Sequence, residues 1–234
     1  MEITFGGHSF FSITSDNKVA FIDPWIDNPH CPDSLKNVKP DLILLTHGHS
    51  DHSSNVIPLA NKYNCPVVCI VELAWLLKQA GLSSDLAIEL NKGGMVEING
   101  FKVNLTHALH SNSFIVNDEP KYAGEACGFV IEAENMAVYH AGDTAIFSDM
   151  DWINFKWSPK VAMLPIGDVY TMGVEEAAEA AHLVQADITI PMHYGTFPVL
   201  KGKPEEFVDL CKKEEISTTV KVLKPGETLS LSEA

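Results

Sequence analysis

Histidine and aspartate are concentrated in one short segment of the chain, Thr46-His47-Gly48-His49-Ser50-Asp51-His52. The imidazoles in such a stretch repel one another when they are protonated, and they are costly to bury without partners. A divalent metal ion removes that cost, because neutral imidazole and carboxylate are its usual ligands. The segment therefore predicts a metal site. A histidine-rich surface loop with incidental metal affinity is the alternative.

The spacing within this segment suits two neighbouring ions. Residues i and i+2 at the end of an extended strand face the same way, so His47 and His49 can share one ion. If the chain then turns into a helix, Asp51 and His52 point at a second position beside the first. One segment can therefore supply ligands to two metals.

These four side chains cannot fill two metal sites, so further ligands are expected elsewhere in the chain. Three candidates each follow a predicted strand: His110, Asp143 and His193. The carboxyl ends of strands are common places for sites, and strand ends from several sheets can converge on one rim. His107 lies three residues before His110 and is an alternative ligand, although it falls in or near the strand.

The elements that must position these residues are short strands and helices. Residues 41–46 form a continuous apolar run directly before the histidine segment, which predicts a strand covered on both faces. Asn99-Gly100 predicts a tight turn between strands over 95–98 and 101–106. The other predicted strands are 1–5, 10–14, 19–23, 67–71, 128–133, 137–140, 161–165, 187–191, 218–223 and 228–231, and the predicted helices are 55–63, 72–80, 174–184 and 204–213.

Strands and helices are mixed along the whole chain, with strands dominating at the start of each part. This favours an α/β fold in which two mixed sheets pack together and helices cover their outer faces. We predict a single domain over residues 1–234, with two similar halves of about 1–115 and 116–234. The boundary between the halves does not have the composition of a linker.

The charge balance is acidic, with 16 lysines and no arginine against 31 aspartates and glutamates, for a formal net charge of −15. This argues against binding to nucleic acid or to an anionic membrane face. No apolar run approaches the span of a bilayer, and residues 1–7 lack the features of a signal peptide. Five widely spaced cysteines do not suggest a disulfide framework. We therefore expect a cytoplasmic protein with reduced thiols.

The histidine segment resembles the signature of the metallo-β-lactamase superfamily, and the three later candidates match that superfamily's ligand positions in order and approximate spacing. Further motifs are similar to a branch of small metal-dependent hydrolases related to ascorbate-6-phosphate lactonase-like proteins. These motifs are Gly7-His8-Ser9, His140-Ala141-Gly142-Asp143-Thr144, Pro165-Ile166-Gly167-Asp168, Thr171-Met172-Gly173 and Met192-His193-Tyr194-Gly195-Thr196-Phe197-Pro198. The resemblance implies a four-layer αββα sandwich with a dinuclear metal site at one edge of the sheets, and a homo-oligomer.

The resemblance also implies which residues hold each ion. The first ion would be held by His47, His49 and His110, the second by Asp51, His52 and His193, and Asp143 would bridge the two. The cofactors would be two divalent metal ions. A histidine-rich ligand set favours Zn, with Mn, Fe and Ni as alternatives.

A metal-dependent hydrolase is the predicted function. Two ions about 3.5–4 Å apart keep a bridging water as hydroxide near neutral pH. Asp51 would orient this hydroxide for attack on a small-molecule ester, lactone, amide or phosphoester. His8 is the second catalytic candidate, either as a hydrogen-bond donor beside the metals or as a substrate contact, with a structural turn histidine as the alternative.

Substrate contacts are predicted for residues that follow two further buried strands. Asp168 and Thr171 can line the pocket, although Asp168 can equally cap a turn. Tyr194 can donate its hydroxyl to a substrate oxygen, with a packed aromatic as the alternative. Trp25 lies in an apolar loop that can flank the pocket or an oligomer contact.

Two other functions are alternatives to hydrolysis of a small molecule. A phosphodiesterase acting on nucleic acid or phospholipid would use the same metals, but the acidic charge and the lack of arginine weigh against a long polyanionic substrate. A metal-binding sensor without turnover would not need the carboxylate of Asp51.

Overall fold

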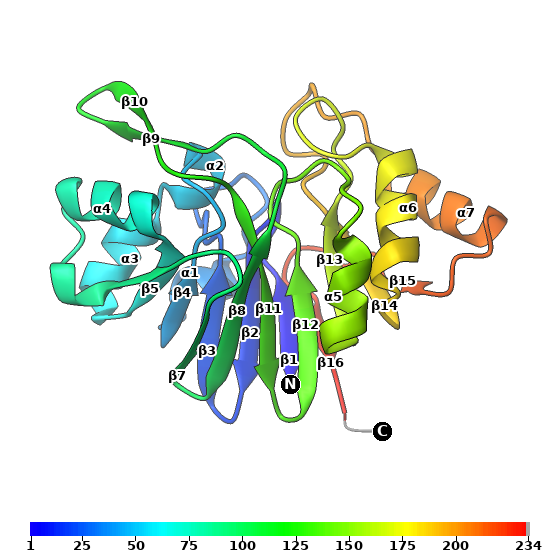
Figure 1. The fold of residues 1–234 in the computed structure, drawn as a ribbon, viewed down its shortest axis with the longest axis horizontal. Helices are drawn as coiled ribbons and strands as arrows, with labels where there is room; N and C mark the ends of the chain where they lie inside the picture. Colours follow the sequence, from blue (N-terminus) through cyan, green and yellow to red (C-terminus); the bar gives the residue numbers. More distant parts are fainter. Residues whose placement is uncertain (233–234) are drawn as a thin grey trace.

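The structure, a computed structural model, describes residues 1–232 of the chain. Two seven-stranded sheets pack face to face, and helices cover both outer faces (Figure 1). This confirms the predicted α/β class and the four-layer αββα arrangement. A small two-stranded hairpin stands apart from both sheets at their upper edge.

The first sheet has the strand order β16-β1-β2-β3-β4-β5-β6. Pairing is antiparallel from β16 to β3 and parallel from β3 to β6. Its strands are β1 (Glu2–Phe5), β2 (Phe11–Ser15), β3 (Lys18–Ile22), β4 (Leu42–Leu44), β5 (Val67–Ile70), β6 (Ala87–Leu90) and β16 (Thr228–Ser230).

The second sheet repeats this plan in the order β15-β14-β13-β12-β11-β8-β7. Pairing is antiparallel from β7 to β12 and parallel from β12 to β15. Its strands are β7 (Met95–Ile98), β8 (Phe101–His107), β11 (Cys127–Ala133), β12 (Met136–His140), β13 (Val161–Pro165), β14 (Ile188–Met192) and β15 (Thr219–Val220). The chain changes sheet between β6 and β7, which falls before the predicted division near residue 115.

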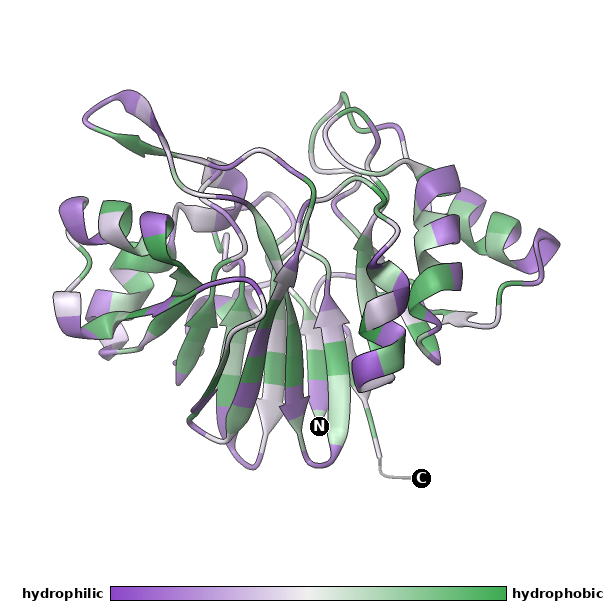
Figure 2. Cartoon of the chain, in the orientation of Figure 1, coloured by the Kyte–Doolittle hydropathy of each residue, from purple (hydrophilic) through white to green (hydrophobic). Residues whose placement is uncertain are grey.

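Three apolar clusters hold the layers together. One lies between the sheets, one packs the first sheet against helices α1, α3 and α4, and one packs the second sheet against α5, α6 and α7. Figure 2 shows the hydrophobic residues along the strands and the hydrophilic residues on the outward faces of the helices. The helices are α1 (Asp33–Lys36), α2 (Ser50–Ser53), α3 (Val56–Tyr63), α4 (Val71–Gln79), α5 (Met150–Trp157), α6 (Val174–Val184) and α7 (Pro204–Lys213), with a 3₁₀ turn at Ser84–Leu86.

Sequence reasoning missed several short elements. Helix α5 buries Met150 and Ile153 but exposes Trp152 and Phe155, so its sequence lacks the contrast between an apolar and a polar face. Strand β6 and the hairpin of β9 (Ser113–Val116) and β10 (Glu119–Tyr122) were also not predicted. The strand predicted over 218–223 is reduced to the two residues of β15.

The pairing pattern brings the important strand ends to one edge. Strands β1 and β3 both run antiparallel to β2, and β4 runs parallel to β3, so their carboxyl ends lie together. Strands β8 and β12 both run antiparallel to β11, and β13 and β14 run parallel to β12. The loops that follow these strands meet at the upper edge in Figure 1, away from both chain ends.

No helix within residues 1–232 is long and apolar enough to cross a membrane.

The five cysteines are all free and buried, and this predicts slow thiol chemistry. Burial raises the pKa of Cys31 and of Cys211 to about 11 and that of Cys65 to about 12. A raised pKa lowers the thiolate fraction at pH 8, so we expect the folded protein to react with Ellman's reagent roughly 100-fold more slowly than the unfolded chain. Rapid labelling of a thiol in the folded protein, at the rate seen in denaturant, would contradict this expectation.

Candidate metal centre

The histidine segment follows β4 and turns into a helix, as the spacing requires for two neighbouring sites. His49 is the N-cap of α2, so Asp51 and His52 lie in the first turn of that helix. Gly48 separates the two parts of the motif, and a Cβ there would lie 2.6 Å from the carbonyl oxygen of Ser113. A glycine is therefore required between His47 and His49, because the base of the β9–β10 hairpin packs against it.

One oxygen of Asp143 lies at the centre of the cluster. Its Oδ2 atom faces Nε2 atoms of four imidazoles, two from the histidine segment and two from later loops. The distances are 3.8 Å to His47, 3.4 Å to His52, 3.8 Å to His110 and 3.0 Å to His193. Asp143 follows β12 in the second sheet and His47 follows β4 in the first, so this carboxylate lies where the two sheets meet.

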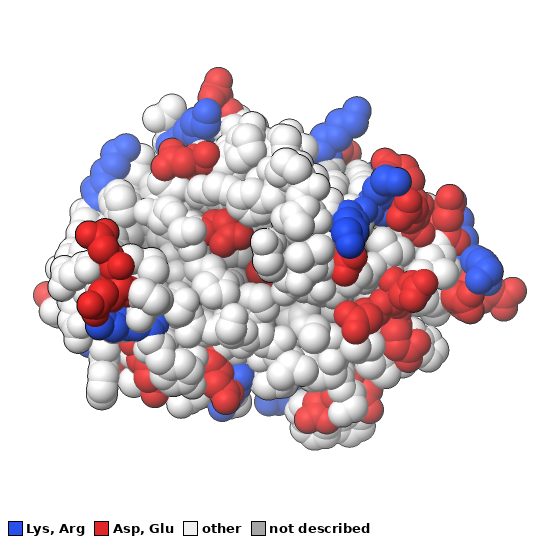
Figure 3. All heavy atoms as spheres, turned by 90° about the horizontal axis from the view of Figure 1, so that it is seen from above, with Lys and Arg blue, Asp and Glu red and all other residues white. Residues whose placement is uncertain are grey.

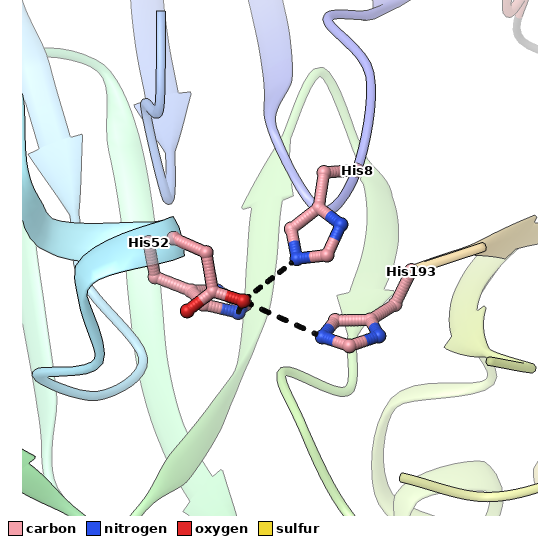
Figure 4. A group of neighbouring side chains, drawn as sticks. His8, His52 and His193 are labelled. Carbon is pink, nitrogen blue, oxygen red and sulfur yellow. Dashed lines mark hydrogen bonds and ion pairs between the residues drawn. The ribbon is translucent and has the colours of Figure 1, made fainter. Parts of the chain in front are cut away.

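The other side chains divide into two groups around this carboxylate. His47, His49 and His110 form one group, whose potential ligand atoms all lie within 4.8 Å of one another. Asp51, His52 and His193 form the other, joined by His8. Figure 4 shows His8, His52 and His193 turned toward a common point. The grouping is the one that the resemblance implied, with His8 added to the second set.

The residues fit a metal, because buried polar atoms at the centre have no hydrogen-bond partner. These atoms include Nε2 of His47, Nε2 of His52 and Oδ1 of Asp143. Leaving such atoms buried and unpaired is costly unless something else satisfies them. Burial also lowers the pKa of His47, His49 and His110, so these imidazoles are neutral and have a lone pair for a cation.

Asp23 orients two of the predicted ligands and was missed by sequence reasoning. The His52 Nδ1–H group donates to Asp23 Oδ2 over 2.8 Å, and the Thr46 hydroxyl donates to the same oxygen over 2.7 Å. Since that hydroxyl has given its proton to Asp23, it can only accept from His47 Nδ1 at 2.9 Å. His47 is therefore held with its Nε2 lone pair directed at the centre, and His52 is held with its Nε2 atom directed there.

Replacing this buried carboxylate should weaken metal binding. We expect Asp23→Asn to reduce metal affinity by about 10- to 100-fold, because partners that orient ligating histidines have effects of this size. Competition with a chromophoric chelator measures the change. Asp41→Asn is the matched control, since Asp41 lies before β4, at the opposite end of the strand, and bonds to Lys18 and the backbone of Val19. Equal affinity in the two variants would refute the orienting role.

His8 is built into the second group by a strained turn. It has a positive φ of 56°, and Gly7 before it has a φ of 89°. Its Nε2 atom lies 3.0 Å from Asp51 Oδ2, and its Nδ1 atom lies 3.0 Å from the hydroxyl of Thr196. Burial lowers the pKa of His8 to about 4, so the ring is neutral and donates from Nε2 to the carboxylate. His8 therefore contacts the cluster and is more than a turn residue.

Other histidines lie near the centre without joining either group. Nδ1 of His107 lies 2.9 Å from Lys92 Nζ, and its ring packs on Phe147, so His110 and not His107 joins the first group. His140 accepts a hydrogen bond from the backbone N–H of Gly142 at Nδ1 and donates from Nε2 to the carbonyl oxygen of Ser9. It therefore ties the Asp143 loop to the turn that holds His8.

The three residues predicted to contact substrate have local roles in the structure. Asp168 Oδ1 accepts from the backbone N–H of Val169, which is the turn-capping alternative. The Thr171 hydroxyl donates to the carbonyl oxygen of Met172, and Tyr194 packs against the apolar cluster beneath α6 and α7. Within residues 1–232, none of these three side chains forms a hydrogen bond or ion pair with the histidine cluster.

A four-layer αββα sandwich with histidines and aspartates clustered at one edge is the arrangement of metallo-β-lactamase-fold proteins. The family described as the beta-lactamase superfamily domain matches residues 2–193 of this chain. The chain is 45 % identical over 237 residues to a UPF0173 metal-dependent hydrolase of Koribacter versatilis, covering 98 % of each. It is 39 % identical over 232 residues to one of Methanosarcina mazei, covering 99 % of each. The chain belongs to this family, the UPF0173 metal-dependent hydrolases of the beta-lactamase superfamily.

Solved structures share the fold over the whole chain. The metallo hydrolase Igni18 of Ignicoccus hospitalis is 36 % identical, with a TM-score of 0.88, and the match covers 100 % of this chain and 99 % of Igni18. An isothiocyanate hydrolase from Delia radicum gut bacteria is 18 % identical, with a TM-score of 0.74 and 99 % of each chain covered. The second similarity is one of fold alone.

Proposed function

We propose that this protein is a metal-dependent hydrolase that holds two divalent ions and cleaves a small-molecule ester, lactone, amide or phosphoester. The observation that carries the proposal is the single Asp143 oxygen that faces imidazoles of both ligand groups. Two divalent ions held there would lower the pKa of a water molecule toward neutral and polarise the oxygen of the bond under attack. The histidine-rich donor set favours Zn.

Asp51 is the carboxylate best placed to orient the attacking water. Its side chain is 22 % exposed, whereas that of Asp143 is only 3 % exposed. Burial acts to raise the pKa of Asp51, but the hydrogen bond from His8 and the nearby His52 outweigh it and hold the pKa below its usual range. Asp51 is therefore ionised and open to solvent, so it can accept a hydrogen bond from water at the centre.

His8 supports this role by fixing the carboxylate. Its Nε2–H donates to Asp51 Oδ2, while the hydroxyl of Thr196 donates to its Nδ1. The turn at Gly6-Gly7 and the loop after β14 thus hold Asp51 from the side opposite α2. We propose that His8 keeps Asp51 in the orientation needed to direct the water.

Activity screening tests the proposal. The metal-loaded protein is assayed against lactones, carboxylic esters, thioesters, amides and phosphodiesters, with and without a chelator. We expect turnover in at least one class that the chelator removes and added metal restores. If the metal-loaded protein turns over none of these substrate classes, a metal-binding sensor is favoured. Tight binding of RNA at low salt would favour the phosphodiesterase alternative. The net charge of −15 leads us to expect no such binding.

A further inference from the structure

The two loops that contain Leu109 and Met172 are both hydrogen-bonded to Thr144, the residue directly after Asp143. The backbone N–H of Leu109 donates to the Thr144 hydroxyl over 2.9 Å, and the N–H of Met172 donates to the Thr144 carbonyl oxygen over 3.0 Å. Leu109 is the neighbour of His110, and Thr144 is the neighbour of Asp143. The loops therefore form one wall beside the metal centre.

This wall carries exposed apolar side chains, which we call the apolar rim. They are Leu109 at 53 %, Val169 at 46 % and Tyr170 at 57 % exposure. Hydrophobic segments lie on the loops that rise at the upper right in Figure 2, beside the edge where the strands end. Exposed apolar side chains on loops that border a functional edge are typical of binding surfaces.

The loop holds Val169 outward in a strained conformation. Val169 has a φ of 63° and follows Asp168 at 61°, although a β-branched residue is strongly disfavoured in this region. Hydrogen bonds fix the turn: Asp168 Oδ1 accepts from the Val169 N–H, and the Asp168 carbonyl oxygen accepts from the Tyr170 N–H over 2.6 Å. Strain kept at an exposed position beside a site points to a binding role.

The surroundings of the rim offer little to an anionic group. Figure 3 shows the face at this edge as mostly uncharged, with acidic side chains near its centre and lysines toward the margin. Lys92 is paired with Glu125, and Lys121 with Glu119. Lys201 lies behind the loop that carries Val169 and Tyr170, where it lines a cavity with Asp168 and with acidic residues of α6 and α7.

We propose that the centre acts on an uncharged substrate whose apolar acyl or aryl group lies against the apolar rim, next to the bond that is cleaved. The proposal rests on the proposed hydrolase function and specifies its substrate class. Val169 and Tyr170 would determine specificity by contact with that apolar group. The absence of arginine from the sequence, the ion pairs of Lys92 and Lys121, and the acidic residues that share a cavity with Lys201 disfavour a carboxylate or phosphate at the same position.

Binding of hydroxamic acids to the metal-loaded protein tests this preference without turnover. Acetohydroxamate, octanohydroxamate and the monohydroxamate of succinic acid carry the same metal-binding head and differ in the tail. Calorimetric titration should give a Kd at least tenfold lower for the octanoyl compound than for the acetyl compound. The succinyl compound should bind no more tightly than the acetyl compound. Equal affinities, or tightest binding by the succinyl compound, would overturn the proposal.

Two variants separate the rim from general hydrophobic binding. Tyr170→Ser should remove most of the octanoyl advantage, whereas Phe155→Ser, on the exposed face of α5, should leave it unchanged. An equal loss in both variants would overturn the assignment to the rim. In parallel, a chain-length series of nitrophenyl esters reports turnover. A tail preference in binding, without turnover of these esters or of any class in the activity screen, would refute the hydrolase function but retain the rim, and turnover without a tail preference would do the reverse.

Discussion

Protein carrying Asp143→Asn is expected to lose most of its divalent metal and nearly all of its hydrolytic activity. One carboxylate oxygen of Asp143 faces four imidazoles, so its loss removes a ligand that both ions would share. An asparagine has nearly the same volume but no charge, and charged oxygen donors bind divalent ions better than neutral ones. We expect kcat/KM to fall by at least about 10³-fold, in line with the loss of a major electrostatic contribution to a transition state.

Elemental analysis and steady-state kinetics on the same preparations check this result. Asp41→Asn again serves as the control, because Asp41 lies before β4, away from the centre. Retention of full metal content and activity by Asp143→Asn would show that this carboxylate does not bridge the two ligand groups. A circular dichroism spectrum equal to that of the wild type excludes simple unfolding as the cause.

The second large effect is expected from Asp51→Asn, which should reduce turnover strongly but leave most of the metal bound. His52, His193 and Asp143 remain to hold the second ion, so metal content should stay largely intact. Turnover should fall by about 10²- to 10⁴-fold, because a neutral amide accepts a hydrogen bond from the attacking water more weakly than a carboxylate and can also turn its NH₂ group toward that water. The measurement is kcat at saturating substrate, alongside metal content.

This variant separates an enzyme from a metal-binding sensor. In a sensor, Asp51 would contribute only to metal affinity, and its replacement would change metal content and metal-dependent stability together. A loss of metal equal to the loss of turnover would contradict the orienting role. Thr196→Val, which removes the hydroxyl partner of His8, should give a smaller decrease in turnover of the same kind, because it loosens His8 and not Asp51 itself.

The metal-binding segment could be predicted from the sequence because its signals are local. A buried strand followed by closely spaced histidines and an aspartate implies ligands at a strand end, whatever the rest of the fold. The sheets were predictable for the same reason, since β4 and β13 are continuous apolar runs buried along their length. Helix α5 was not predictable, because Trp152 and Phe155 place large apolar side chains on its exposed face, so the sequence shows no apolar-to-polar periodicity.

Asp23 shows where local reasoning stops. It stands at the end of a strand, as the predicted ligands do, but its role depends on Thr46 and His52, which are brought to it only when β3 pairs with β4. Substrate contacts are harder still to predict from sequence. Tyr194 neighbours His193 in the sequence, yet the two side chains face different ways: His193 faces the centre, and Tyr194 faces the cluster beneath α6.

The apolar rim likewise arises from tertiary structure. Leu109 and Val169 are far apart in the sequence, and each is an apolar loop residue that belongs to no motif. They lie on the same wall because their loops both bond to Thr144. Sequence reasoning could indicate which side chains gather at the candidate metal centre, but not the surface that we propose selects its substrate.

The number of metal ions bound per chain shows whether Asp143 joins two metal sites. Protein purified without chelator, and then incubated with excess Zn, Mn, Fe or Ni, is freed of unbound metal and examined by elemental analysis. We predict two divalent ions per chain, held by ligand groups that share Asp143. A chain that binds no ion, or never more than one with any of these metals, would contradict it.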